Sequence, residues 1–113
     1  KKVARKISLE LPRSEIVTEE LERDQSLRFA RDGVSVEFGR DPRGRATVTV
    51  SESIKNHTDE ELQAMGEELS NGIVRQYVYQ KLTDEMRARD FVVVEEETNA
   101  DQSIRLKVRH WEN

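Results

Sequence analysis

The sequence contains no cysteine in its 113 residues, and it has only two prolines and five glycines. Without cysteine, disulfide bonds, thiolate metal sites and cysteine nucleophiles are excluded. The low proline and glycine content excludes collagen-like and linker-like chains. No apolar run reaches the roughly 18 to 20 residues of a membrane-spanning helix, and the charged start lacks the apolar segment of a signal peptide. These absences predict a soluble, cytoplasmic protein without a membrane partner.

Aromatic residues are also few, at 5%, whereas charged residues reach 37%. The 19 basic and 23 acidic residues give a net charge of −4, which argues against a dedicated nucleic-acid-binding protein but leaves room for a local basic patch. Isoleucine, leucine, valine and phenylalanine still contribute 28 residues. That is about a quarter of the chain, more than the roughly 20% below which charged chains stay disordered. We therefore expect a single folded α+β domain over residues 1–113.

Period-two alternation of apolar residues predicts several strands. The first covers residues 3–11, and Arg5 is the only polar residue on its apolar face. The dipeptide Asp32-Gly33 suits a two-residue type I′ turn, in which both central residues need positive φ. Counting outward from this turn pairs Phe29 with Val36 and predicts a hairpin over residues 27–38. A strand over residues 46–50 then completes a three-stranded meander.

Helices are predicted in two regions. Residues 14–24 suit a short helix with Ser14 as its N-cap. Thr58 and Glu61 form a capping-box pattern, and apolar residues at helical spacing continue from there to about residue 89. Gly72 leaves open whether this region is one long helix or two short ones.

The last part of the chain predicts a second hairpin, with strands over residues 91–97 and 103–110 joined by the five residues 98–102. In this register Val92 faces Val108 and Val94 faces Leu106. The predicted fold is α+β, with an antiparallel sheet of about five to six strands (a meander plus the C-terminal hairpin). One long helix or two short helices pack on one face of this sheet.

The C-terminal 40 residues resemble a known family. Three segments carry the resemblance: Tyr77-Val-Tyr79, Phe91-Val-Val-Val-Glu-Glu-Glu97, and Ser103-Ile-Arg-Leu-Lys-Val-Arg109 followed by Trp111. They resemble a family of unassigned function found in bacteria and, as a conserved open reading frame, in some plastid genomes. Its members are associated with operons that include an ATPase and a small ubiquitin-sized protein. The resemblance implies a component of a protein assembly, and it supplies no catalytic residue.

Two basic segments are candidate binding sites. The loop over residues 39–45 carries Arg40, Arg43 and Arg45 together with Gly39 and Gly44. It lacks the lysine and the following helix of a nucleotide-binding phosphate loop, so either a plain turn or an anion contact fits it. Arg105, Lys107 and Arg109 alternate on the last strand beside Trp111, a pattern that suits single-stranded nucleic acid or an acidic partner, or an internal ladder to the glutamates.

The acidic residues do not form a convincing catalytic set. Glu95 and Glu97 share one strand face, where Arg105 and Lys107 across the hairpin keep both ionised, although acid–base catalysis needs one of them protonated. The carboxylates after His57 occupy successive helical positions and fan around the axis instead of converging on a metal. We therefore expect no enzyme activity, no cofactor and no metal.

These observations predict a non-catalytic interaction or assembly subunit that binds other protein chains, including further copies of itself. The alternative is a nucleic-acid-binding accessory protein that uses the Arg40–Arg45 loop and the basic last strand.

Overall fold

The computed structural model describes residues 4–100 and 104–110. The chain forms two compact units, Lys1–Val74 (unit 1) and Arg75–Asn113 (unit 2). Its elements, in chain order, are β1 (Arg5–Leu9), α1 (Glu15–Thr18), β2 (Leu27–Arg31), β3 (Val34–Arg40), β4 (Ala46–Glu52), α2 (Asp59–Ala88), β5 (Phe91–Thr98) and β6 (Ile104–His110). The α+β class is confirmed, with the strands divided between a four-stranded sheet and a hairpin. The prediction of one domain over the whole chain stays a prediction.

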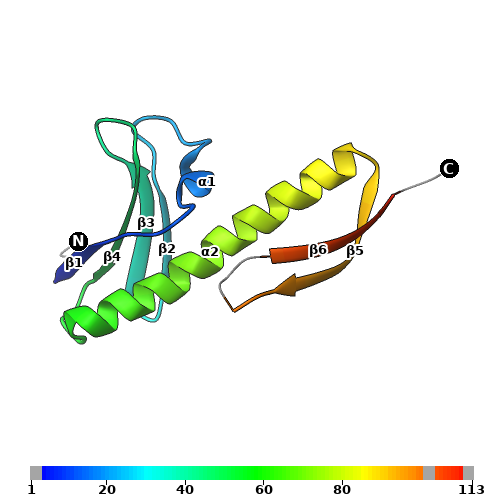
Figure 1. The fold of residues 1–113 in the computed structure, drawn as a ribbon. Coiled ribbons are helices and arrows are strands. Elements are labelled where there is room, and N and C mark those ends of the chain that lie inside the picture. The colour runs from blue at the N-terminus through cyan, green and yellow to red at the C-terminus, as the bar shows by residue number, and fades with distance from the viewer. Residues whose placement is uncertain (1–3, 101–103, 111–113) are drawn as a thin grey trace. The chain divides into compact units, whose positions relative to one another are not determined.

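Unit 1 contains the four-stranded antiparallel sheet, in the order β1-β4-β3-β2 (Figure 1). The predicted meander β2-β3-β4 is confirmed, and β1 adds to it beside β4. The hairpin register is also confirmed, because Phe29 lies opposite Val36 and Leu27 opposite Phe38. Asp32 and Gly33 have φ of 55° and 81°, the positive values that a type I′ turn needs.

The core of unit 1 lies on one face of this sheet. Val36, Phe38 and Val50 are fully buried there. Phe38 also meets Phe29 edge to face, with ring centroids 6.0 Å apart. Apolar residues therefore alternate inward along each strand, as period two requires.

The first half of α2 covers this core with residues spaced by four: Leu62, Gly66, Ser70 and Val74, all buried. Gly66 is where the helix comes closest to the sheet, because a Cβ built on it would lie 2.7 Å from Val50 Cβ. The predicted capping box is confirmed at the start of the helix. The Glu61 amide donates to Thr58 Oγ1 at 3.1 Å, and the Thr58 amide donates to Glu61 Oε1 at 2.9 Å.

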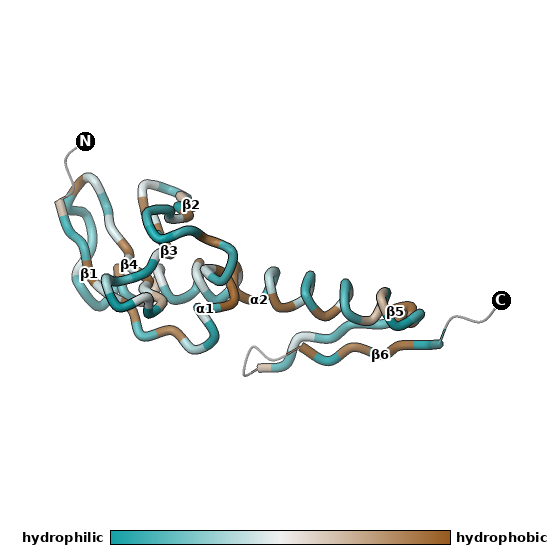
Figure 2. Tube along the Cα trace, turned by 90° about the horizontal axis from the view of Figure 1, so that it is seen from above, coloured by the Kyte–Doolittle hydropathy of each residue, from teal (hydrophilic) through white to brown (hydrophobic). Residues whose placement is uncertain are grey.

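Unit 2 contains the second half of α2 and the β5–β6 hairpin, which runs back alongside the helix (Figures 1 and 2). The helix is continuous through Gly72, so the region forms one long helix. Hydrophobic residues recur along this half of α2 and along β6 (Figure 2). None of the described side chains of unit 2 is buried, although many are half-buried.

The predicted helix over residues 14–24 is wrong in extent, because α1 covers only Glu15–Thr18. Ser14 has helical backbone angles and its side chain makes no capping hydrogen bond. Helices in proteins are stabilised mainly by burying an apolar face, and the apolar face of this segment is too narrow to stabilise a longer helix. Val17 is the one apolar residue of α1 that is buried.

The predicted register of the second hairpin is also wrong. Val92 lies opposite Arg109, and Val93 opposite Val108. A β-bulge between Val93 and Glu95 leaves Val94 without a partner. The bulge places Phe91 and Val93 on the same face as Ile104, Leu106 and Val108, while Glu95 and Glu97 share the other face with the basic residues. No helix formed by the described residues is long and apolar enough to cross a membrane.

Candidate functional site

A cluster of charged side chains lies at the end of the sheet where β1 and β4 meet. Arg5 lies directly opposite Glu52 in the register, and Glu52 is only 4% exposed. Glu52 Oε2 is 3.7 Å from Arg5 Nε, and Glu52 Oε1 is 2.8 Å from His57 Nδ1. Arg5 also pairs with Asp59, the first residue of α2. The cluster therefore joins two strands, the loop that leaves the sheet and the start of the helix.

The Glu52 carboxylate is held in its ionised form. The hydrogen bond from the His57 side chain, helped by the backbone amides of Asn56 and His57, lowers the pKa of Glu52 against the opposing effect of burial. Because a carboxylate only accepts hydrogen bonds, His57 Nδ1 carries the proton. This carboxylate fixes the imidazole ring in one orientation, which stabilises the strand-to-helix connection.

Sequence reasoning did not assign this cluster, although a signal was present. Arg5 is a polar residue on an apolar strand face. Glu52 continues the inward series Ala46, Val48, Val50 by strict alternation. Two opposite charges on the inner faces of two strands predict that these two residues lie opposite each other in paired strands. In the sequence, His57 stands beside the carboxylates that follow it, which does not indicate a contact with Glu52. Among the described residues no group of three or more histidine, cysteine or acidic residues could hold a metal ion.

Removal of the His57 ring is expected to raise the pKa of Glu52 toward its ordinary value. In the wild-type protein this lowered pKa adds stability above the unfolded-state pKa, and the contribution is lost as pH falls through the folded-state value. In His57→Ala this contribution is smaller, and its loss starts at the same unfolded-state pKa but is complete at a higher pH. Carbon-13 NMR titration of the Glu52 carboxyl group measures the shift directly.

Arg45→Ala is the matched control for this titration. The backbone amide of Arg45 is the main cause of the lowered pKa of Asp41, and the Arg45 side chain adds to it. Arg45→Ala is therefore expected to raise the pKa of Asp41 partly and to leave that of Glu52 unchanged. An unchanged Glu52 titration in His57→Ala would contradict the assignment.

The arginine-rich loop is closed by its own acidic residue. Asp41 Oδ1 accepts hydrogen bonds from the amides of Arg43 and Arg45, both at 2.9 Å, and Asp41 Oδ2 pairs with Arg45 Nε at 2.9 Å. Arg40 donates to the carbonyl oxygen of Thr18. The amides that could have cradled a phosphate therefore already bind a carboxylate. Only the side chain of Arg43, among the three arginines, is exposed and makes no interaction with the described residues.

The basic strand β6 carries its cations on one exposed face. Lys107 lies opposite Glu95, and Arg105 lies opposite Glu97, with Arg105 Nη1 3.5 Å from Glu97 Oε1. One cross-strand ion pair, between Arg105 and Glu97, therefore forms on this face. Arg109 lies opposite Val92 and makes no ion pair with the described residues. Trp111, the remaining predicted binding residue, lies outside the described residues. The loop arginines belong to unit 1 and the strand cations to unit 2.

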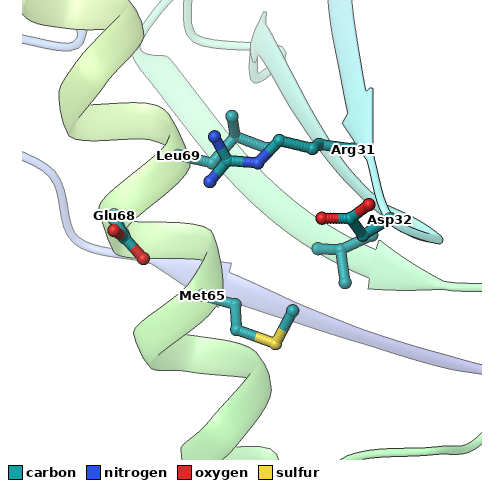
Figure 3. A pocket seen from close by; sticks show the side chains of 6 residues that line it. Arg31, Asp32, Met65, Glu68 and Leu69 are labelled. Carbon is teal, nitrogen blue, oxygen red and sulfur yellow. The ribbon is translucent and has the colours of Figure 1, made fainter.

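Two of the cavities formed by described residues lie in unit 1. The first, of about 60 Å³, lies between the β2–β3 turn and α2 (Figure 3), and is lined by Arg31, Asp32, Val34, Met65, Glu68 and Leu69. The second is an open groove of about 290 Å³ on the outer face of the sheet. Its lining mixes the cations of Lys6, Arg23 and Arg40 with the carboxylates of Asp24 and Glu37. Small-molecule sites have roughly 300 to 1,000 Å³ and mostly apolar walls. Neither cavity has that character.

No protein-family model matches this sequence, and comparison with curated proteins and with solved structures gives no significant match. The resemblance of the C-terminal segment to the bacterial and plastid family therefore stays a prediction.

Proposed function

We propose that this chain is a non-catalytic, cytoplasmic assembly subunit that binds other protein chains through unit 2. One observation carries this proposal: no described side chain of unit 2 is buried. Unit 2 nevertheless contains a row of apolar residues on α2 (Tyr77, Val78, Leu82 and Met86) and a row on the hairpin (Phe91, Val93, Ile104, Leu106 and Val108).

The strands of unit 2 support the same proposal. Among the described residues β5 and β6 pair with each other and with no other strand, so each has one open edge. A two-stranded hairpin is at best marginally stable in water, and three or more strands or further packing are needed for independent stability. A partner chain that adds apolar contacts would complete the core that unit 2 only begins.

The acidic residues favour a structural role over a catalytic one. Glu95, Glu96 and Glu97 are all exposed, and two of them lie opposite cations. Exposed carboxylates opposite cations on a neighbouring strand are typical of cross-strand pairs that stabilise a hairpin. The alternative of nucleic-acid binding stays a prediction, and the closure of the arginine loop by Asp41 weakens it.

The substitution Val94→Arg is expected to weaken the binding of the partner to unit 2. Val94 is 49% exposed in the bulge, so the substitution leaves the fold intact but places a bulky charge beside the proposed interface. We expect at least about a tenfold loss of the bound partner, because burying an unpaired charge against an apolar partner costs more than the roughly 1.4 kcal/mol that corresponds to a factor of ten. The measurement is affinity isolation of the full chain at native expression level, with quantitative mass spectrometry of what remains bound.

Ile54→Arg is the matched control, because Ile54 is the other large exposed apolar residue among those described, 76% exposed and located in unit 1. This variant is expected to retain the partner. Light scattering after size exclusion shows whether that partner is a second copy. Loss of the same partner from both variants, or from neither, would contradict the assignment to unit 2.

A further inference from the structure

The outer edge of β6 is the most regular open strand edge of unit 2. β6 has seven residues, Ile104–His110, with no proline, no glycine and no bulge. The edge of β5 is different, because its ladder is interrupted between Val93 and Glu95. Bulges are one of the means by which proteins prevent strand edges from pairing with other chains. β6 lacks that protection, and the backbone groups on its outer edge have no strand partner in the described part of the chain.

The side chains of β6 specify what kind of strand fits this edge. Ile104, Leu106 and Val108 are half-buried on one face, whereas Arg105, Lys107 and Arg109 are exposed on the other. A strand that pairs with β6 places its own alternate residues beside these two rows. Apolar residues on one face and acidic residues on the other extend both rows favourably.

β5 shows the acidic half of this match inside the molecule itself. Past the bulge it sets Glu95 opposite Lys107 and Glu97 opposite Arg105. These contacts use only part of the positive charge, because the Arg105 side chain remains 79% exposed and Arg109 lies opposite a valine. The cations of β6 can therefore pair with acidic residues on their other side.

We propose that the β6 edge binds an extended segment of a partner protein in which acidic and apolar residues alternate, and that this segment adds a strand to the hairpin. The proposal rests on the assembly role given above and names the chemistry of the partner. Main-chain hydrogen bonds supply affinity in this mode of recognition, and the alternate side chains supply specificity.

A second copy of this chain does not meet these requirements. Any pairing of two β6 edges that keeps the apolar residues on one face sets cation beside cation, for example Lys107 beside Lys107, which is unfavourable. The β5 strand of another copy is acidic, but its three valines and three glutamates are consecutive instead of alternating, and its ladder contains the bulge.

The test uses the full chain and a fluorescein-labelled, end-capped octapeptide of alternating glutamate and valine, with binding followed by fluorescence anisotropy. Arg109→Glu is expected to weaken binding about tenfold, since it converts an attraction into a repulsion at one position. Lys55→Glu makes the same charge change at an exposed loop residue of unit 1 and is expected to leave binding unchanged. Amide NMR shifts on titration are expected on β6.

Two further peptides separate strand pairing from plain charge attraction. An octapeptide with the same glutamates and valines in two consecutive blocks, and one that alternates lysine with valine, are both expected not to bind. Equal binding of the block peptide, equal weakening by the two variants, or shifts outside β6 would overturn the proposal. So would self-association of the chain that disappears in Lys107→Glu. If the β6 proposal fails in one of these ways, the affinity isolation with Val94→Arg still tests the assembly role independently.

Discussion

Truncation of Leu62 to alanine is expected to lower the free energy of unfolding by about 2–5 kcal/mol, the cost of deleting a fully buried leucine and leaving a cavity. The side chain is 0% exposed and lies in the first half of α2, among the residues that cover the sheet. Domains of this size have only about 5–15 kcal/mol in total. Urea denaturation at 25 °C measures the change.

Leu82→Ala makes the same chemical change on the same helix, but in unit 2, where the side chain is only half-buried. Its cost is expected to be about 1 kcal/mol, in proportion to the smaller area removed from water. The contrast tests the claim that unit 2 is an unfinished core. Equal losses at the two positions would show that both halves of α2 are buried to the same extent in solution.

Alanine at Gly66 is expected to destabilise the protein, whereas alanine at Gly72 is expected to stabilise it. A Cβ at Gly66 would lie 2.7 Å from Val50 Cβ, and a separation that short forces the helix or the sheet to move. Overpacking of this kind costs about 1–3 kcal/mol. At Gly72 no described atom outside the neighbouring helix backbone lies within 4 Å of the new Cβ. The substitution is therefore expected to stabilise the protein by roughly 0.5–1 kcal/mol, the amount by which glycine inside a helix is less stable than alanine.

The two glycine variants form a pair with opposite expected signs in one helix. Thermal unfolding followed by circular dichroism is sufficient, because the shifts of Tm should differ in direction. If Gly66→Ala raised Tm as much as Gly72→Ala, the close approach of α2 to Val50 would be wrong. A Gly66→Val variant is expected to lose still more stability, since it adds two further methyl groups at the same contact.

Local signals were sufficient to predict the first hairpin. Asp32-Gly33 accepts positive φ at both positions, which fixes the turn and therefore the register. Strict alternation on both sides then allows only one set of residues to face the core. The capping box at Thr58 and Glu61 was predictable for a similar reason, because both partners lie within one helical turn.

The register of the second hairpin could not be predicted in this way. The run Val92-Val93-Val94 is apolar at every position, so it does not indicate which residues face the core, and nothing in the sequence marks the bulge. The sharing of one face by the glutamates and the cations agrees with the prediction, although the predicted register sets Glu95 opposite Arg105 where the structure has Lys107.

The site was partly predictable as well. Alternation along β5 and β6 predicts that the glutamates and the cations share one face of the hairpin. The hydrogen bonds of Asp41 to the arginine loop are not part of the prediction. An aspartate at the first position of such a turn commonly bonds the amides two residues on, so Asp41 was the available signal. The Arg5–Glu52 pair required knowing that β1 and β4 are neighbours, which depends on contacts between distant parts of the chain.

The bulge at Val94 also determines where the chain can change in length. A strand that loses or gains one residue normally turns all later side chains to the opposite face. Deletion of Val94, by contrast, removes the residue without a partner and leaves Val93 opposite Val108 and Glu95 opposite Lys107. Val94 is therefore a position in β5 where deletion of a single residue leaves every other side chain of the strand on the face that it already occupies.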